Sequence, residues 1–394
     1  MESCEIFFSM EQRTGMKKTR VLFSGISSNI GGVETFLLEY IRHMNRDVIQ
    51  FDLLCNTPTP ALEEEFVGLG VTIYKVSARS RNPLKSVREI EAFFRTHAGE
   101  YDVFWCNKCM LNNLDYLKYA KKYGIPVRVI HSHNSALMDT GIKGRLIQFL
   151  HEKGKKKIVS YATHFWACSD YAARWFYAKD VIASEQYCFI PNATDVEKFR
   201  FREDVRSVYR EKLGLEKQFV VGHVGRFHMQ KNHLFMVDIF AALHQKKPES
   251  VLMLIGQGEL EQQVKEKVAG LGLTDVVRFM GVRKDVPALM QAMDCFLLPS
   301  LFEGLPVVAV EAQSSGLPCY LAENGTTRQT QITDRCYFLN LNNAPEVWAD
   351  AIINGIGTRI DTYEQVCKAG FEINQASIRL QEKLIGMAQK EKTC

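Results

Sequence analysis

The sequence lacks the segments that would carry the chain into or across a membrane. No run approaches the roughly 20 apolar residues of a spanning helix. Residues 1–15 have neither the basic start nor the long apolar stretch of a signal peptide, and we expect residues 1–17 to form an irregular leader. We therefore expect a cytoplasmic protein that could meet a membrane only from its inner face.

Paired cysteines are also missing. The 11 cysteines are an odd number, scattered from Cys4 to Cys394. Cys106 and Cys109 form one CxxC, but no second pair at zinc-finger spacing accompanies it. Most of the others lie in apolar runs, where a thiol packs as a small hydrophobic group. The pattern excludes a secreted disulfide framework and favours a reducing compartment.

Two further absences limit the chemistry. The sequence contains no Asp-x-Asp, so no carboxylate pair suggests a metal site, and we expect no cofactor. The glycine turn after the first expected strand reads Gly31-Gly32-Val33-Glu34, which is not the G-x-G-x-x-G of a dinucleotide fold. The formal net charge of +4 is too small to indicate a nucleic-acid partner.

What the sequence does contain is a regular alternation of strand-like and helix-like segments. Such alternation is typical of βαβ units with parallel sheets. At 394 residues the chain is long enough for two domains. The strands that we expect are Thr19–Ser24, Gln50–Cys55, Val71–Val76, Tyr101–Cys106, Val127–His131 and His164–Cys168, then Phe219–Gly225, Val251–Gly256, Val277–Gly281, Cys295–Pro299 and Pro318–Leu321.

The alternation restarts after a polar stretch, Asp195–Lys217, which predicts a domain boundary near residues 190–215. We expect an α/β fold of two doubly wound, Rossmann-like domains that face each other across a cleft. The predicted parts are residues 18–195 for the first domain, residues 196–370 for the second domain, and a C-terminal helix over 371–394 that packs back on the first domain. The helix-like pattern there begins earlier, at about Tyr363, and continues to Glu391.

Three short motifs follow strands and could meet an anion. Gly31-Gly32 precedes a helix, whose N-terminus attracts anions, although a plain turn fits as well. Arg226 and Lys231 place two cations after a strand, which suits a diphosphate or simply a solvated loop. Gly256-Gln257-Gly258 taken alone is more typical of a turn.

The most specific motif is Pro299–Ala312, PSLFEGLPVVAVEA. Pro306 suits a helix start, so Glu303 would lie near the positive end of the helix and Glu311 within it. Carboxylates accept hydrogen bonds from sugar and ribose hydroxyls. Stabilisation of the helix dipole alone would also explain Glu303.

Taken in order, GGVE, GR with a lysine, GxGxL and the two glutamates around Gly-Leu-Pro resemble the family 4 glycosyltransferases with the GT-B fold. The resemblance covers roughly Lys18 to Ala388. It implies a retaining transferase that moves a hexose or N-acetylhexosamine from a nucleotide-diphosphate sugar, by default a UDP-sugar. The acceptor would be a saccharide or a polyprenyl-diphosphate-linked glycan of exopolysaccharide or capsule type.

The resemblance also implies how the second domain holds the donor. Arg226 and Lys231 would bind the diphosphate and act in catalysis. The turn of Gly256 and Gly258 would lie beside the donor. Glu311 would accept hydrogen bonds from the ribose hydroxyls. With cations stabilising the leaving group, no metal ion would be needed.

The transferred sugar is assigned by the same resemblance to the loop before the second glutamate. Glu303, with the backbone of Gly304 and Leu305, would hold the sugar and the distal phosphate, and Glu303 is a predicted catalytic residue. Gly31 and Gly32 would approach the diphosphate or the acceptor from the first domain.

Three other residues match family positions. Arg283 corresponds to a position near the base, and Asn192 to the hinge between the domains. His131 corresponds to a histidine that contacts the sugar near the reaction centre. We expect the ring of His133 to point away from that of His131, and we therefore favour His131 as the catalytic contact.

The sequence departs from the family pattern in two places. The stretch Trp105-Cys106-Asn107 stands where many relatives carry His-x-His. The stretch Ala322–Gln329 lacks a glutamate that we can match. Alternatives therefore stay open: an epimerase, which would convert the donor without an acceptor; a phosphorylase, which would need a pyridoxal lysine; or a binding protein without turnover.

A basic cluster surrounds an apolar stretch, Leu146-Ile147 and Phe149-Leu150. This combination suits either peripheral contact with an anionic membrane or a solvated helix face. The cluster comprises Lys143, Arg145, Lys153, Lys155, Lys156 and Lys157.

Overall fold

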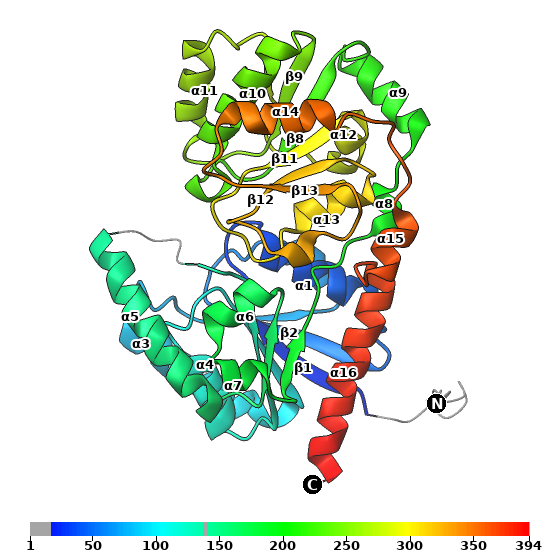
Figure 1. Cartoon of the computed structure of the whole chain (residues 1–394). Helices are drawn as coiled ribbons and strands as arrows, with labels where there is room; N and C mark the ends of the chain where they lie inside the picture. The colour runs from blue at the N-terminus through cyan, green and yellow to red at the C-terminus, as the bar shows by residue number, and fades with distance from the viewer. Residues whose placement is uncertain (1–16, 137–140, 394) are drawn as a thin grey trace.

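The computed structural model describes residues 17–136 and 141–393 and has two lobes stacked one above the other (Figure 1). Each lobe is an α/β domain with one parallel sheet between layers of helices. The fold is therefore the expected pair of doubly wound domains.

The first domain is built on a seven-stranded sheet with the order β3-β2-β1-β4-β5-β6-β7. All neighbouring strands are parallel, and Ser24 of β1 pairs with Cys106 of β4. The strands are β1 (Thr19–Ser24), β2 (Ile49–Cys55), β3 (Thr72–Lys75), β4 (Val103–Lys108), β5 (Val127–Ser132), β6 (His164–Ala167) and β7 (Tyr187–Phe189).

Helices cover both faces of this sheet because its central strands are apolar on both sides. Val21 and Phe23 of β1 pack toward α1 (Gly32–His43), whereas Leu22 packs toward α3 (Pro83–His97) and α4 (Asp115–Lys122). Alternate residues of a strand point to opposite faces, so each face receives its own core. The other helices are α2 (Glu63–Gly68), α5 (Gly141–Lys157), α6 (Asp170–Phe176) and α7 (Lys179–Ile182).

The second domain repeats this plan with the order β10-β9-β8-β11-β12-β13. Its strands are β8 (Phe219–Val224), β9 (Ser250–Ile255), β10 (Val277–Phe279), β11 (Cys295–Leu298), β12 (Cys319–Ala322) and β13 (Cys336–Leu339). Its helices are α8 (Val196–Phe199), α9 (Glu203–Lys212), α10 (His233–Lys246), α11 (Glu261–Gly270), α12 (Val286–Ala292), α13 (Val307–Ser314), α14 (Pro345–Asn354) and α15 (Tyr363–Lys368).

Every strand that the sequence predicts is present, and two short ones were missed. The missed strands, β7 and β13, lie at sheet edges and have three and four residues. The expectation of one helix from about Tyr363 to Glu391 is wrong. The helix stops at Lys368, Gly370 takes a φ of +88°, and α16 (Ile373–Thr393) starts a new helix.

The last helix, α16, returns to the first domain (Figure 1). Ile373, Ala376, Leu380 and Leu384 recur every three or four residues and are buried in the same core as α1 and β1. The two segments that join the lobes also pair: Thr194 N–H donates to Phe371 O at 3.0 Å, and Ile373 N–H donates to Thr194 O at 3.0 Å.

Candidate active site

The predicted site residues lie on loops that leave the carboxyl ends of the strands. In each sheet the strand order reverses between two neighbours, β1 and β4 in the first and β8 and β11 in the second. Open parallel sheets bind ligands at such switch points. The glycine turn follows β1, the Arg226 and Lys231 loop follows β8, and the Glu303 loop follows β11.

Lys231 and Glu303 form the central contact of the second domain. Lys231 lies in the short helix η4 (Met229–Lys231), and its Nζ is 2.7 Å from Glu303 Oε1. The Lys231 and Glu303 side chains are only 16% and 7% exposed. Gln230 donates through Nε2 to Phe302 O at 2.9 Å and to Glu303 Oε2 at 3.3 Å. The carboxylate is thus fixed from two sides in the ligand-free protein.

Arg226 lies at the rim, with 58% of its side chain exposed, and its Nη2 is 3.0 Å from Glu259 Oε2. Behind it, Gly256 and Gly258 let two loops touch. A Cβ on Gly256 would lie 2.1 Å from Gly225 O, and one on Gly258 would lie 2.4 Å from Phe227 O. These two glycines therefore shape the arginine loop through backbone contact.

Glu311 and Arg283 occupy two further positions on the second domain. Burial raises the pKa of Glu311 to about 7, the positive charge of Lys198 opposes this shift, and Glu39 of α1 adds to it. Arg283 donates from Nε and Nη2 to the two oxygens of Asp285 at 2.8 and 2.7 Å. This pair lowers the pKa of Asp285 to about 2.

The Glu303 loop also touches the first domain. Ser135 Oγ donates to Glu303 O at 2.5 Å, and Asn192 Nδ2 donates to Leu305 O at 2.5 Å. A Cβ on Gly304 would lie 3.1 Å from both His133 O and Cys168 Sγ, so a larger residue would press on the first domain. The loop is therefore positioned by both lobes.

Gly31 and Gly32 begin α1 on the opposite side, with Gly31 as the N-cap. Glu34 folds back so that its Oε1 accepts from Ser27 N–H at 2.8 Å, and a Cβ on Gly31 would lie 3.1 Å from Glu34 Oε2. A Cβ on Gly32 would meet nothing within 4 Å. Open space at Gly32 leaves room for a ligand at the helix N-terminus.

The two histidines differ from expectation. Their ring centroids are 4.0 Å apart, so the expectation that His133 points away from His131 is wrong, because residues two apart share one face of a strand. His131 has no exposed surface and packs among Phe36, Trp105 and Trp166. His133 is half-buried and is thus the more exposed of the two residues. The placement therefore argues against the choice of His131 as the contact.

Three residues of this region were not singled out as site residues: Gln230, Ser135 and Asn107. Gln230 stands directly before Lys231, so the motif itself could have indicated it. Asn107 ends the stretch that replaces His-x-His, so the family pattern could have indicated it. Ser135 is brought to the site by the parallel order of the sheet, and no local pattern in the sequence marks it.

The basic cluster lies mainly on α5. Its apolar residues Leu146, Phe149 and Leu150 are exposed, and Lys153 Nζ lies 4.3 Å from the centre of the Phe149 ring. The side chain of Lys143 lies outside the described residues. The exposed cations are Arg145, Lys153, Lys156 and Lys157, whereas Lys155 is half-buried and donates to Arg174 O at 3.2 Å.

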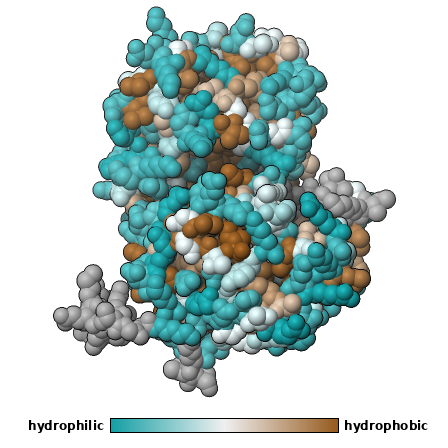
Figure 2. Space-filling model, turned by 180° about the vertical axis from the view of Figure 1, so that it is seen from behind, coloured by the Kyte–Doolittle hydropathy of each residue, from teal (hydrophilic) through white to brown (hydrophobic). Residues whose placement is uncertain are grey.

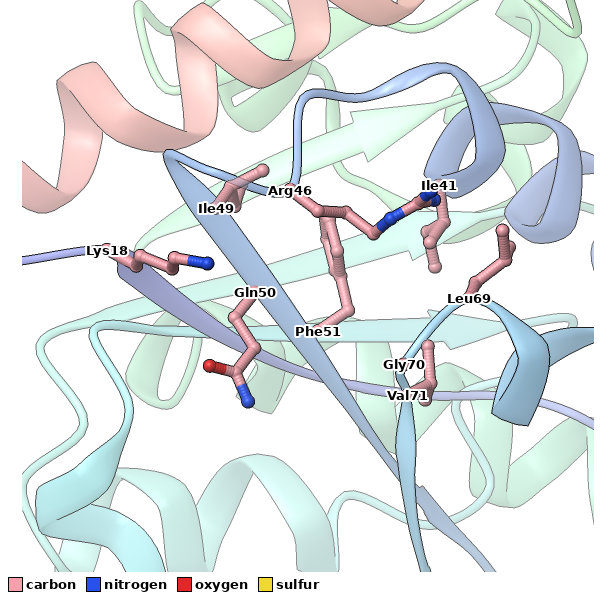
Figure 3. Close-up of a pocket in the computed structure, with 9 residues that line it drawn as sticks. All are labelled: Lys18, Ile41, Arg46, Ile49, Gln50, Phe51, Leu69, Gly70 and Val71. Atoms are coloured by element: carbon pink, nitrogen blue, oxygen red, sulfur yellow. The ribbon is translucent and has the colours of Figure 1, made fainter. Parts of the chain in front are cut away.

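The surface seen from behind is hollowed between the two lobes, with apolar residues in the hollow (Figure 2). A separate pocket of about 280 Å³ lies at the amino ends of β1 and β2, lined by Lys18, Ile49 and other residues of that edge (Figure 3). It contains no predicted site residue and lies away from the carboxyl ends, so we do not assign the reaction to it.

Among residues 17–136 and 141–393, no group of three or more His, Cys, Asp or Glu side chains is placed to hold a metal ion. No helix of the same part is long and apolar enough to span a bilayer.

Comparison with solved structures defines the fold: two Rossmann-like lobes arranged as in the GT-B fold. HepE of Anabaena, whose structure was solved with UDP and glucose, superimposes with a TM-score of 0.69 at 20% identity over 94% of this chain and 98% of HepE. A glycosyltransferase of Rickettsia africae superimposes with a TM-score of 0.73 at 14% identity over 94% and 99% of the two chains.

Sequence comparison then identifies the family. Residues 31–193 match the glycosyl transferase 4-like domain, and residues 205–367 match the glycosyl transferases group 1. EpsF of Bacillus subtilis (strain 168), which is named as a glycosyltransferase, is 32% identical over 338 residues, covering 84% of this chain and 86% of EpsF. The chain therefore belongs to the group 1, or family 4, glycosyltransferases and is a glycosyltransferase.

A second relative carries a more specific name. The Escherichia coli UDP-Gal:alpha-D-GlcNAc-diphosphoundecaprenol alpha-1,3-galactosyltransferase is 25% identical over 336 residues, covering 83% of this chain and 84% of that enzyme.

Proposed function

We propose that this protein transfers a hexose or N-acetylhexosamine from a UDP-sugar, with retention of anomeric configuration, to a saccharide or polyprenyl-diphosphate-linked acceptor during synthesis of a surface polysaccharide. The observation that carries the proposal is the buried contact between Lys231 and Glu303 at the switch point of the second sheet, on a loop that Ser135 of the first domain also contacts. The proposal is further supported by the E. coli relative, whose name includes both a UDP-sugar and a diphosphoundecaprenol acceptor.

The donor's diphosphate would lie between Arg226 and Lys231. These cations contact Glu259 and Glu303, so a bound diphosphate would compete with two carboxylates for the positive charge of Arg226 and Lys231. The charge on the leaving diphosphate grows as the sugar departs, and fixed cations stabilise it most at that moment. One such contact is worth about 3 kcal/mol of the barrier.

Retention is explained by attack from the face that the diphosphate leaves. The acceptor oxygen forms the new bond to the anomeric carbon while the bond to the phosphate oxygen breaks. The acceptor's proton passes to that phosphate oxygen, so no protein base is needed. Glu303 would hold the sugar hydroxyls, Glu311 would accept from the ribose, and Arg283 would lie near the base.

A thermal-shift screen of UDP-, GDP- and ADP-sugars, each with and without EDTA, tests the donor. We expect a UDP-sugar to stabilise the fold by about 2.7 kcal/mol at a hundredfold excess over its Kd, with EDTA making no difference. Protection by none of the nucleotides would contradict the proposal, and loss of protection with EDTA would contradict its metal-independent form.

A radiolabelled UDP-sugar incubated with diphosphate-linked and soluble saccharides tests the acceptor. Transfer to a lipid-linked saccharide with a retained anomeric configuration, read from the NMR coupling constant of the product, is the expected result. An inverted product would contradict the mechanism but leave the donor assignment intact.

A further inference from the structure

Asn107, at the end of β4, is held close to the loops that follow β1 and β5. Gly25 follows β1 with a φ of +122°, and a Cβ there would lie 2.5 Å from Asn107 O, so only glycine permits this approach. His133 N–H donates to Lys108 O at 3.1 Å, which brings His133 beside Asn107. Three strand ends are therefore joined at one residue.

The hydrogen bonds of Asn107 fix which way its amide points. Its Nδ2 donates to Ser24 O at 3.1 Å and to Trp105 O at 3.4 Å. Both partners are carbonyl oxygens, which can only accept, so the NH₂ group must face them. The amide oxygen then faces His133, and it lies 2.8 Å from His133 Nε2. An amide oxygen only accepts, so Nε2 must carry a proton.

The surroundings keep the His133 ring neutral. Burial lowers the pKa of His133 to about 3, and its ring packs against those of Phe36 and His131, with centroid distances of 5.2 and 4.0 Å. A neutral ring with its proton on Nε2 has a lone pair on Nδ1. Among the described residues Nδ1 has no hydrogen-bond partner.

We propose that Asn107 is a positioning residue, which holds His133 in one tautomer so that Nδ1 accepts a hydrogen bond from a hydroxyl of the donor sugar. This inference rests on the proposed function. It names His133 Nδ1 as a hydrogen-bond acceptor in that same site. His133 O also lies against Gly304, next to Glu303, so the ring belongs to the loop contact that would surround the sugar.

Two-bond ¹H–¹⁵N NMR of the full chain with ¹⁵N-labelled histidine tests the tautomer without any ligand. The His133 signals are assigned by their loss in His133→Gln. We expect protonated Nε2 and bare Nδ1 at pH 7 in the native protein, and a mixture of tautomers in Asn107→Leu. A native signal from protonated Nδ1, or no change in Asn107→Leu, would overturn the proposal.

Calorimetry with UDP and UDP-glucose tests the role. Asn107→Leu and His133→Ala should each weaken UDP-glucose binding about tenfold, the size of one hydrogen bond, and leave UDP binding within twofold. In the double variant the losses should not add, because both changes remove the same contact. Additive losses, or equal losses for UDP, would overturn it.

Asn82→Leu is the control for general damage. It removes an amide of the first domain that caps α3 by accepting from Lys85 N–H at 3.0 Å, and it should leave both affinities unchanged. If the native protein binds UDP but His133 shows no preferred tautomer, the role of Asn107 is wrong and the proposed function stands. If native protein binds neither UDP nor a UDP-sugar, the proposed function fails.

Discussion

At the scale of single residues, the two cations of the candidate site each contact a carboxylate. Lys231 and Glu303 form a contact of 2.7 Å with little exposed surface. Taking two charges out of water is costly, and their mutual contact offsets that cost only while both are present. A donor diphosphate would enter a site where the cation is already positioned.

Replacing Lys231 with alanine should lower the free energy of unfolding by about 3 kcal/mol, because Glu303 would stay buried without its cation. Denaturant titration measures this change. Lys231→Met combined with Glu303→Gln should recover most of the loss. A single variant as stable as the native protein would show that the pair is solvated rather than buried.

In the proposed donor site, Glu311 should make donor binding depend on pH near neutrality. Its pKa of about 7 means that the free protein gains the charged carboxylate, the better acceptor for ribose hydroxyls, as the pH rises from 6 to 8. We expect the affinity for UDP-glucose to rise by up to about tenfold over this range and to stay flat in Glu311→Gln. Calorimetry at pH 6, 7 and 8 decides this.

The same carboxyl affects stability with the opposite sign. The pKa of Glu311 in the folded protein is raised above the ordinary value of 4.5. The contribution of the protonated carboxyl to the free energy of unfolding is therefore fully present below pH 4.5 and is lost as the pH rises through about 7. The free energy of unfolding of Glu311→Gln, relative to that of the native protein, should therefore rise by up to about 3 kcal/mol between pH 5 and pH 8. If the difference in free energy of unfolding between the variant and the native protein is the same at both pH values, solvent reaches the Glu311 carboxyl.

At the scale of elements, α16 shows how one amphipathic helix ties the chain together. Leu384 is fully buried against the first domain, whereas Ile378 on the same helix is 52% exposed. Leu384→Ala should cost about 2 to 5 kcal/mol through lost burial and a cavity. Ile378→Ala should cost less than about 0.5 kcal/mol. Thermal unfolding of both variants tests the contrast, and equal effects would contradict the packing.

Helix α5 combines apolar and cationic residues on its exposed side. Gly154 lets this helix pack closely against the loop that carries Leu111, since a Cβ on Gly154 would lie 2.1 Å from Leu111 O. We propose that the exposed side contacts an anionic membrane, where each lysine near the surface contributes about 1 kcal/mol.

Replacing Lys155, Lys156 and Lys157 with glutamate should release the protein from phosphatidylglycerol vesicles in a sedimentation assay. The control is the same change of charge on exposed lysines of the second domain, Lys212, Lys217 and Lys265. If both triple variants sediment with the vesicles as fully as the native protein does, the membrane proposal is wrong.

At the scale of the whole molecule, hydrogen bonds that cross between the lobes hold their relative position. Ser135 Oγ donates to Glu303 O, and Thr327 donates to the Asp170 carboxylate, so each contact joins one lobe to the other. A hydrogen bond of this kind is worth about 1 kcal/mol. Together, two such bonds would stabilise this arrangement of the lobes by about 2 kcal/mol.

Ser135→Ala combined with Thr327→Val should therefore favour the wider arrangement by about 2 kcal/mol. Small-angle X-ray scattering should show a larger radius of gyration than in the native protein, and UDP-glucose should reduce it again. An unchanged radius of gyration without ligand would show that the paired crossing segments alone set the arrangement.

The sequence by itself determined the two parallel sheets, since apolar runs of strand length alternate with amphipathic helices. It also placed Arg226, Lys231 and Glu303 at strand ends, because each lies directly beside its strand in the chain. The tertiary structure alone decided what these residues touch. Lys231 meets Glu303 only because β8 pairs with β11.

The same reason explains the two histidines. Local pattern could not choose between His131 and His133, because exposure depends on Phe36 and Asn107, which arrive from α1 and β4. The break before α16 has a similar origin, since the chain leaves the helix to pair with Thr194, far away in sequence. Contacts between distant segments carry no local periodicity, and only the folded chain defines them.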